Sequence, residues 1–283
     1  MKKIYADHAA TTKLSDKALA VMMPYLQESY KNPSTLYSSA RAPRKALAAA
    51  REMIATAIGS FPNEIFFTSG GTEADNWAIK NILFSSAASR KKIITSCIEH
   101  HAILNSCTVM EKLGFEVIYL PVGRDGLVNM DTLEKEMGND IALVSIMFAN
   151  NEIGTIQNIK ELALVAHKYG ALFHTDAVQA VGHIEFDVKD LDIDMLSASA
   201  HKFNGPKGIG FLYVKNGVEL HSLITGGSQE SGKRAGTENV ASIVGMAEAL
   251  KENVLSIEAN SKYLFSLERL FLDKLKKITS ILL

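Results

Sequence analysis

Cysteine is scarce in this sequence: Cys97 and Cys107 are the only two among 283 residues. Two cysteines in so long a chain do not make a disulfide framework, and they suit a reducing compartment such as the cytoplasm. Net charge is also nearly absent, because 30 lysine and arginine residues face 31 aspartate and glutamate residues. Nucleic-acid-binding proteins normally carry a basic excess or a basic stripe, so we expect no nucleic-acid partner.

Long apolar runs are missing as well. The longest apolar-rich segment, residues 141–150, has the length of a strand, whereas a membrane span needs about 18 to 20 residues. The first 12 residues hold no apolar core of the kind that a secretory signal requires. With 47% hydrophobic residues, the sequence predicts a cytoplasmic protein with a real core, no membrane partner, and one large domain or two of ordinary size.

Short apolar segments alternate with amphipathic segments along the chain. This alternation indicates βα units and a mostly parallel sheet. Before it, residues 44–59 predict an alanine-rich helix that ends at Gly59, and residues 237–277 predict one or two long helices. We expect strands at 64–68, 92–96, 115–121, 141–149, 171–176, 192–199 and 209–214, and helices at 71–84, 100–114, 130–138 and 159–170.

Polar residues cluster at the predicted carboxyl ends of these strands, where open α/β sheets bind their ligands. The first cluster is TSGGTEADN at 68–76, in which Gly70 and Gly71 precede a helix start and Thr72 offers a hydroxyl. Free N–H groups and the positive end of the helix dipole favour a phosphate there. The alternative is an ordinary βα turn capped by Thr68 or Thr72, since neither a Walker A nor a GxGxxG spacing is present.

Two further clusters follow the next strands. His100 begins a predicted helix beside His101, and adjacent residues point about 100° apart, so the pair does not readily ligate one metal. At a helix N-terminus an imidazole tends to stay neutral, so His100 could stack on a flat ligand or could be a hydrogen-bonded, partly buried side chain. Asn150 and Asn151 end an apolar strand and predict either polar ligand contacts or a stabilised turn.

Asp176 and Lys202 carry charge at the ends of two strands that read as buried. The Asp176 carboxylate needs a partner: a metal shared with His174 on the same strand face, or a protonated heteroaromatic nitrogen, with Gln179 one turn further on. A lysine in a desolvated pocket becomes a nucleophilic amine suited to a Schiff base. The alternatives for Lys202 are an ion pair with Asp176 or extension into solvent.

Together these residues meet the needs of pyridoxal 5′-phosphate (PLP). That cofactor requires an anchored phosphate, a clamped ring, a carboxylate against its pyridine nitrogen and a lysine for its aldehyde. The residues Thr72, His100, Asp176 and Lys202 supply these four functions in chain order, and we assign no metal site. A Lys202 amine freed by substrate would be the natural base for a Cα proton.

The motifs also resemble those of the NifS/IscS-type cysteine desulfurases, within the class-V aminotransferases of fold-type I. The match in order and spacing comprises YADHAATT, KNPST, FTSGGTEADNWAIK, ITSCIEHHAIL, VSIMFANNEIGTIQ, FHTDAVQAVG, SASAHKFNGPKGIG and GGSQESGKRAGTENV. The resemblance implies a fold-type I PLP-dependent transferase large domain with a seven-stranded, mostly parallel sheet and helices on both faces. It also implies cysteine desulfurase activity: L-cysteine to L-alanine, with sulfur passing to an enzyme cysteine.

The resemblance also implies roles for single residues at the ring end of the cofactor. Lys202 is then the Schiff-base lysine, His100 stacks on the ring, and Asp176 pairs with the pyridinium nitrogen. Gln179 and Asn151 lie near the 3′-oxygen of the ring, and Asn151 is also placed for substrate.

At the phosphate end, the resemblance implies that Thr72, Ser199 and His201 hold the phosphate together with the backbone of Gly71. Thr237 matches a threonine that reaches the phosphate of the partner subunit. This match implies a homodimer with composite sites.

The departures from the family pattern concern sulfur transfer. The family's sulfur-accepting cysteine and a substrate-carboxylate arginine belong to a C-terminal small domain, and the resemblance places both beyond residue 283. We therefore expect a C-terminally truncated chain: residues 1–14 go with the small domain, 15–255 form the PLP-binding large domain, and 256–283 begin an incomplete small domain. Cys97 follows a predicted strand, and Cys107 falls mid-helix, where core packing is expected.

The predicted function is that of a PLP-dependent cysteine desulfurase that serves iron–sulfur cluster or thio-cofactor assembly, with a scaffold or sulfur-acceptor protein as a further partner. Two alternatives stay open. One is another class-V lyase or aminotransferase acting on small amino acids. The other is a PLP-binding, desulfurase-inactive chain that acts as a dimerising or scaffold-binding protein.

Overall fold

A seven-stranded sheet organises the chain in the computed structural model, which describes residues 4–84 and 89–278. The outermost parts of the predicted N-terminal and small-domain segments, residues 1–3 and 279–283, lie outside the described residues. The sheet order is β1-β7-β6-β5-β4-β2-β3. The strands are β1 (Ile65–Thr68), β2 (Lys92–Ser96), β3 (Glu116–Leu120), β4 (Ile141–Ser145), β5 (Leu172–Asp176), β6 (Met195–Ser199) and β7 (Gly210–Val214).

The prediction of a mostly parallel sheet is confirmed. Strands β6, β5, β4, β2 and β3 pair in parallel, and β7 is antiparallel to both of its neighbours, β1 and β6. All strands except β7 therefore present their carboxyl ends at the same edge of the sheet. That edge carries the polar residues singled out in the sequence.

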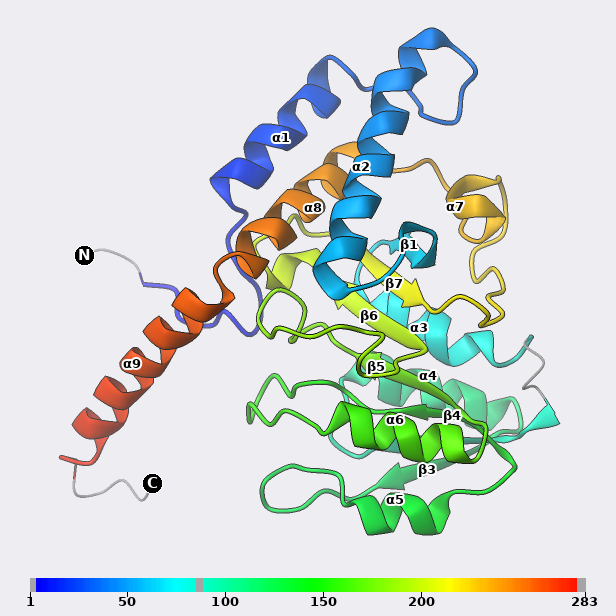
Figure 1. The fold of residues 1–283 in the computed structure, drawn as a ribbon, viewed down its shortest axis with the longest axis vertical. Helices are drawn as coiled ribbons and strands as arrows, with labels where there is room; N and C mark the ends of the chain where they lie inside the picture. Colours follow the sequence, from blue (N-terminus) through cyan, green and yellow to red (C-terminus); the bar gives the residue numbers. More distant parts are fainter. Residues whose placement is uncertain (1–3, 85–88, 279–283) are drawn as a thin grey trace.

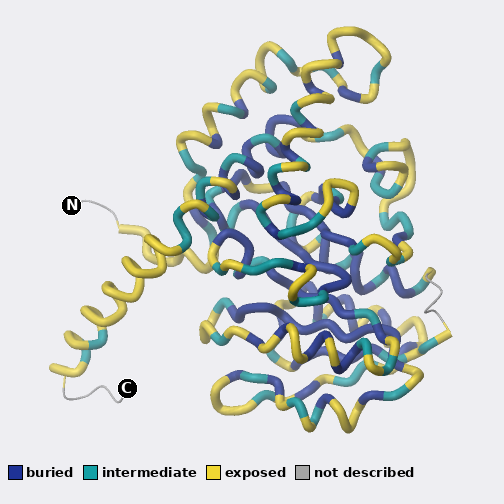
Figure 2. The backbone as a smooth tube through the Cα atoms, viewed as in Figure 1, coloured by how far each residue is buried: buried dark blue, intermediate teal, exposed yellow. Residues whose placement is uncertain are grey.

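Helices cover both faces of the sheet (Figure 1). On one face α3 (Gly71–Asn81) and α4 (His101–Lys112) enclose a core around Trp77. On the other face a larger core joins the sheet to α2 (Arg41–Ile58), α5 (Met130–Glu136), α6 (Ile159–Lys168) and α8 (Val240–Val254). Because both faces are covered, β4, β6 and β7 are buried along their whole length, which explains why they read as continuous apolar runs (Figure 2).

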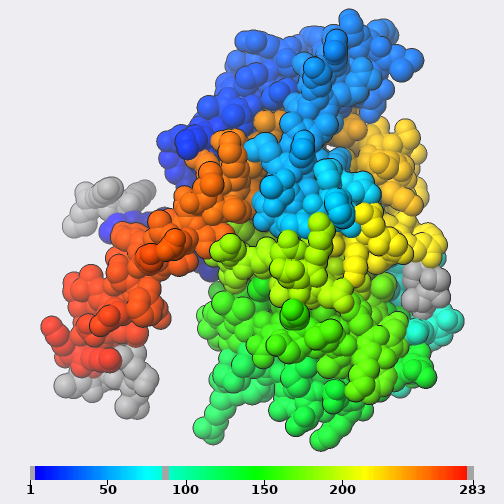
Figure 3. Space-filling view, viewed as in Figure 1, coloured from blue at the N-terminus to red at the C-terminus, as the bar shows by residue number. Residues whose placement is uncertain are grey.

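The helices at the two ends of the chain were predicted less completely. Helix α1 (Asp16–Gln27) packs on α8 and was not predicted; only Ala18 and Met22 in it are buried, and much of it is exposed. The predicted C-terminal helical stretch is two helices, α8 and α9 (Ile257–Leu275). Helix α9 contains no buried residue and projects from the body of the molecule (Figures 2 and 3). The short helix α7 (Gln229–Gly232) lies in the loop before α8.

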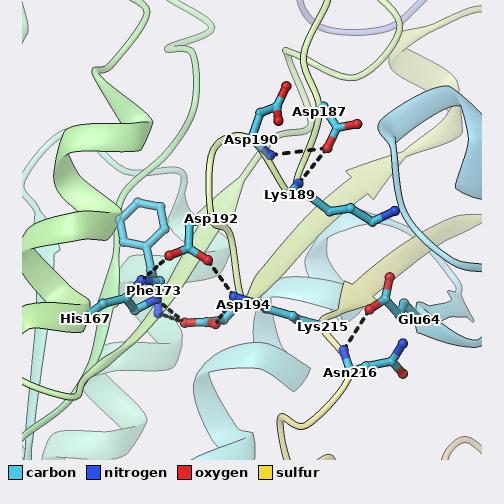
Figure 4. Close-up of polar contacts among 10 residues, drawn as sticks. All are labelled: Glu64, His167, Phe173, Asp187, Lys189, Asp190, Asp192, Asp194, Lys215 and Asn216. Atoms are coloured by element: carbon cyan, nitrogen blue, oxygen red, sulfur yellow. Dashed lines mark hydrogen bonds and ion pairs between the residues drawn. The ribbon is translucent and has the colours of Figure 1, made fainter.

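A charged cluster ties together the edge of the sheet opposite the predicted site (Figure 4). His167, in the last turn of α6, lies 3.0 Å from the Asp192 carboxylate and 2.7 Å from the Asp194 carboxylate. Asp194 also accepts the Phe173 N–H at the start of β5, and Lys215, just after β7, contacts both aspartates. These bonds connect one helix with three strands and leave the other edge of the sheet free for a ligand.

Candidate active site

A cavity of about 890 Å³ opens at the carboxyl-end edge of the sheet. Its wall combines the α3 N-terminus, the α4 N-terminus, the end of β5, the segment after β6 and the N-terminal loop. The structure brings nine of the ten predicted site residues to this cavity: Gly71, Thr72, His100, Asn151, Asp176, Gln179, Ser199, His201 and Lys202. The tenth, Thr237, lines a second cavity of about 70 Å³, which shares Ser69 and Gly208 with the first.

One end of the cavity is built to receive an anion. Helix α3 begins there after Gly70, with a backbone φ of 151°, and no side chain caps this helix end. The Thr68 hydroxyl accepts the Gly70 N–H at 3.3 Å and so stabilises the turn, as the predicted alternative has it, but among the described residues neither Thr68 nor Thr72 caps an N–H group of the helix itself. A Cβ on Gly71 would lie 2.6 Å from Cγ2 of Val178, so a side chain at this position would close the floor of the anion end. Free N–H groups at an uncapped helix N-terminus favour a phosphate.

Two side chains from the end of β6 complete the anion end. Ser199 is the last residue of the strand and is buried, and His201 follows in a short 3₁₀ helix, Ala200–Lys202. Nδ1 of His201 lies 3.1 Å from the hydroxyl of Thr11, and burial lowers the pKa of the ring, as does the nearby Lys202. His201 is thereby favoured as a neutral hydrogen-bonding group.

Asp176 is a buried carboxyl group in the middle of the cavity. Its Oδ1 accepts the Val178 N–H at 2.9 Å. Burial raises the pKa of Asp176, and the Val178 bond and the positive charge of Lys202 oppose that rise only in part. A buried carboxyl group with no close cation is costly to ionise, and a ligand N–H⁺ would relieve that cost.

The two histidines near Asp176 have different roles. His100 is the N-cap of α4 and its Nδ1 accepts the Ala102 N–H at 3.1 Å, so that nitrogen carries no proton and the ring is neutral. His174 is fully buried, which lowers its pKa to about 3, and its two nitrogens contact the hydroxyls of Ser145 and Ser197 at 2.8 and 3.0 Å. The hydrogen-bond partners give no support to a metal shared by His174 and Asp176, because both His174 nitrogens already contact hydroxyl groups.

Lys202 lines the cavity and is partly buried, whereas a lysine is usually exposed on the surface. Its Nζ donates to the carbonyls of Ala9 and, at 3.1 Å, Ala10 in the N-terminal loop. Among the described residues it forms no ion pair with Asp176, so that alternative is also not found. Burial lowers the pKa of Lys202, while the carboxylates of Asp176 and Asp7 act in the opposite direction. A partly desolvated amine of this kind is a better nucleophile than a surface lysine.

Asn150 and Asn151 differ although they are adjacent. Oδ1 of Asn150 accepts hydrogen bonds from the N–H groups of Glu152 and Ile153 at 2.8 and 3.1 Å. Asn150 therefore forms the stabilised turn, which was one of the two alternatives predicted from the sequence. Asn151 instead lines the cavity. Gln179 also lines it, and its Nε2 donates to the Ala9 carbonyl at 3.0 Å, so it holds the same loop as Lys202.

Asp75 is a cavity residue that sequence reasoning missed. It lies inside the TSGGTEADN motif, four residues after Gly71, so the two share one face of α3. The available signal in the sequence was an acidic residue on the side of the predicted helix that packs against the sheet.

The cysteines behave as expected from their positions: Cys107 is buried, which raises its pKa to about 12, and Cys97 is exposed and does not line the cavity.

The donor set of the cavity fits PLP. It offers an anion end, a neutral imidazole at the helix α4 start, a buried carboxyl group that lacks a cation, and a desolvated amine. An independent observation supports the fit: Oδ1 of Asp75 is buried in the cavity wall and has no hydrogen-bond partner in the part of the chain that the structure describes. This fold and this donor chemistry define the fold-type I PLP-dependent enzymes.

The comparisons with known proteins identify the family within that class. The class-V aminotransferase family matches residues 4–283. The cysteine desulfurase IscS of Dictyoglomus turgidum is 50% identical over 276 residues, which are 98% of this chain and 70% of the relative. A solved structure of a NifS-like protein superposes with a TM-score of 0.95 at 39% identity, covering 98% of this chain and 76% of that one. The chain therefore belongs to the class-V aminotransferases, as a PLP-dependent enzyme of the NifS/IscS-type cysteine desulfurase group.

A second solved structure carries a ligand. It is described as SspA in complex with cysteine, is 41% identical to this chain and has a TM-score of 0.85. The match covers 88% of this chain and 72% of that one. No helix among residues 4–84 and 89–278 is both long and apolar enough to cross a membrane.

Proposed function

We propose that this protein takes part in PLP-dependent desulfuration of L-cysteine to L-alanine, with the sulfur destined for iron–sulfur cluster or thio-cofactor assembly. The observation that carries the proposal is the placement of Lys202 and Asp176 in one cavity, an amine and a buried carboxyl group that face the same space. The desulfurase relatives and the cysteine-bound SspA support the choice of substrate.

Each residue of the cavity has a proposed role in holding the cofactor. The α3 N-terminus at Gly71, with Thr72, Ser199 and His201, holds the phosphate. His100 would lie against the ring, held in place by the hydrogen bond that its Nδ1 accepts from the Ala102 N–H.

The remaining contacts position the ring. Asp176 would pair with the ring nitrogen through its Oδ2, because its Oδ1 already accepts a hydrogen bond from the Val178 N–H. Asn151 and Gln179 lie at the edge of the ring that carries the 3′-oxygen, and Gln179 also orders the N-terminal loop.

The chain's own chemistry centres on Nζ of Lys202. When bound, PLP supplies an electron sink that stabilises the carbanion left after loss of a Cα proton. Lys202 would hold the cofactor until the substrate amine replaces it, and the Lys202 amine released in this way, which is neutral more often because burial lowers its pKa, would then take that proton. Asp176 keeps negative charge against the ring, which maintains the electron sink.

Sulfur acceptance is the part of the reaction for which the described residues offer no group. Cys107 is buried with a raised pKa, and Cys97 is exposed but outside the cavity. We therefore propose that this polypeptide binds PLP and labilises the Cα proton but releases little sulfide.

The proposal extends to the assembly. Thr237 lies outside the cavity of its own subunit and exposed, as a residue that reaches the partner's phosphate would be. We propose a cytoplasmic homodimer with composite sites, which delivers sulfur to a scaffold or acceptor protein.

The test begins with the cofactor. Titration of the purified protein with PLP should produce a visible absorption band, and borohydride should then fix the cofactor on the peptide that contains Lys202, as read by mass spectrometry. Lys202→Ala is the matched control, in which no covalent label forms. A wild-type protein that takes up no PLP would overturn the whole proposal.

The second step distinguishes a catalytic protein from the alternative of a desulfurase-inactive, scaffold-binding protein. In deuterated buffer, the PLP-loaded protein should exchange the Cα proton of L-cysteine or L-alanine for deuterium, which NMR measures directly. Exchange should disappear in Lys202→Ala. PLP binding without exchange would favour the desulfurase-inactive alternative, and exchange with a strong preference for other small amino acids would favour a different class-V reaction.

A further inference from the structure

Asp75 is a buried acid that faces the cofactor-binding acid Asp176. It lies in the second turn of α3, is 1% exposed and lines the main cavity. Side-chain ligand atoms of Asp75, Asp176 and His100 all lie within 4.8 Å of one another. Oδ1 of Asp75 has no hydrogen-bond partner among the described residues. The proposed function uses Asp176 and leaves Asp75 without a role.

The surroundings of Asp75 offer hydrogen bonds but no cation. The hydroxyl of Ser197 hydrogen-bonds to its carboxyl group, and Ser197 in turn contacts Nε2 of His174 at 3.0 Å. His174 lies 3.9 Å from Oδ1 of Asp75 but is neutral, since burial lowers its pKa to about 3. A further titratable group that acts on Asp75 is Glu99, another buried acid, whose Oε1 accepts hydrogen bonds from the Ser96 hydroxyl and the Met147 N–H.

Two carboxyl groups this close in a buried site cannot both ionise at neutral pH, as in other carboxyl pairs that share a proton. Asp176 has the environment that favours charge: the Val178 N–H and the nearby Lys202. Asp75 lies past the free N–H groups of α3, and burial followed by repulsion from Asp176 raises its pKa well above the ordinary range.

We propose that Asp75 is a positioning residue for Asp176: it holds the single proton of the pair and stays a neutral acid, so that Asp176 alone carries the charge that faces the cofactor. This inference rests on the proposed function. One carboxylate then meets one ring N–H⁺, and the charges balance inside the cavity. A second negative charge at Asp75 would have no partner and would draw the ring away from Asp176.

The experiment compares three substitutions in the full chain. Asp75→Asn keeps the size and the neutral charge of the protonated acid, Asp75→Ala removes the group, and Asp176→Asn removes the proposed charge. The readout is the Kd for PLP, measured by absorption titration of the apo protein. Fluorescence of the single tryptophan, Trp77, checks that each variant is folded.

The expected result is an asymmetry between two isosteric changes. Asp75→Asn should bind PLP within about threefold of wild type, because it reproduces a neutral hydrogen-bonding group. Asp75→Ala should bind about tenfold more weakly, since Ser197 and Asp176 both lose a neighbour. Asp176→Asn should weaken binding by at least about 30-fold, as loss of one partner of a buried charge pair does. Equal losses in Asp75→Asn and Asp176→Asn would show that Asp75 is charged and overturn the inference.

Infrared spectroscopy of the apo protein gives a second readout that does not need the cofactor. A protonated carboxyl group has its own carbonyl stretch, and we expect part of that signal in wild type to vanish in Asp75→Asn. Glu99→Gln is the matched control, because Glu99 is the other buried acid nearby and burial raises its pKa to about 8. A wild-type signal unchanged by Asp75→Asn would refute the proton assignment even if PLP binds. A signal that changes as expected in a protein that takes up no PLP would overturn the proposed function instead.

Discussion

Glu230 joins three segments of the chain next to the anion end of the cavity, and we predict that Glu230→Ala strongly destabilises the fold. Its side chain is 4% exposed and accepts hydrogen bonds from both terminal nitrogens of Arg51, at 2.9 and 2.7 Å. It also accepts the backbone N–H of Phe67 in β1 at 2.9 Å. Arg51 belongs to α2, so one carboxylate connects α2 and β1 to the loop that contains Thr237.

The size of the effect follows from what alanine leaves behind. Removing one partner of a buried ion pair costs about 3–5 kcal/mol, because the remaining charge stays desolvated. The guanidinium of Arg51 is 22% exposed and still donates to the Ile65 carbonyl, which places the expected loss near the lower limit, about 3 kcal/mol. The loss of the hydrogen bond from the Phe67 N–H is already included in this loss of about 3 kcal/mol, because the contacts of Glu230 are not independent of one another.

Urea unfolding followed by Trp77 fluorescence measures this loss. With a slope near the upper end of the usual range, about 3 kcal/mol per molar urea, the midpoint should fall by about 1 M. Glu258→Ala is the matched control: Glu258 pairs with Lys262 on the exposed helix α9, where such a pair contributes only a few tenths of a kcal/mol. Equal midpoints for Glu230→Ala and Glu258→Ala would refute the reasoning.

Three further predictions concern other parts of the molecule. Hydrogen bonds to its aspartate partners, first of all Asp194, raise the pKa of His167 in the folded protein. The stability that His167 contributes is therefore complete below pH about 6.5 and is lost as the pH rises through the folded-state pKa. His167→Asn should lower the urea midpoint more at pH 6 than at pH 9, and a larger effect at pH 9 would contradict this pH dependence. Gly71→Ala should cost about 1–3 kcal/mol and weaken PLP binding through contact with Val178, and adding Val178→Ala should restore both, whereas no recovery would exclude that contact as the cause. A thiol reagent at pH 8 should label exposed Cys97 and leave buried Cys107 unmodified until urea is added, as peptide mass spectrometry would show; fast labelling of both would contradict the packing of α4.

Much of the cavity was predictable from the sequence because its residues follow strands. A buried strand in a covered sheet is mostly apolar, so a charged residue that ends it, such as Asp176, stands out. Parallel strands bring their carboxyl ends to one edge, which places these residues together without knowledge of the strand order. Asp75 was missed for the opposite reason, since it lies within a helix where acidic residues are ordinary and only packing shows its burial.

The competing interpretations could be separated only by hydrogen-bond partners. Asn150 and Asn151 are identical in type and adjacent, yet one closes a turn and the other faces the cavity. His174 and Asp176 share a strand face as expected, but the two hydroxyls beside His174 remove it as a ligand. The domain limits proposed at residues 14 and 255 stay a prediction.

The sequence by itself determined the α/β class, the strands and the chemical types of residue at one edge of the sheet, because periodicity and strand ends are local properties of the chain. The tertiary structure decided which groups lie close together or share a hydrogen bond. Lys202 meets Ala9 and Ala10 from almost 200 residues away, and Asp75 meets Asp176 across the helix–sheet interface. Burial and the partners supplied by distant segments set the charge on each group, and neither can be read from a residue's neighbours in sequence.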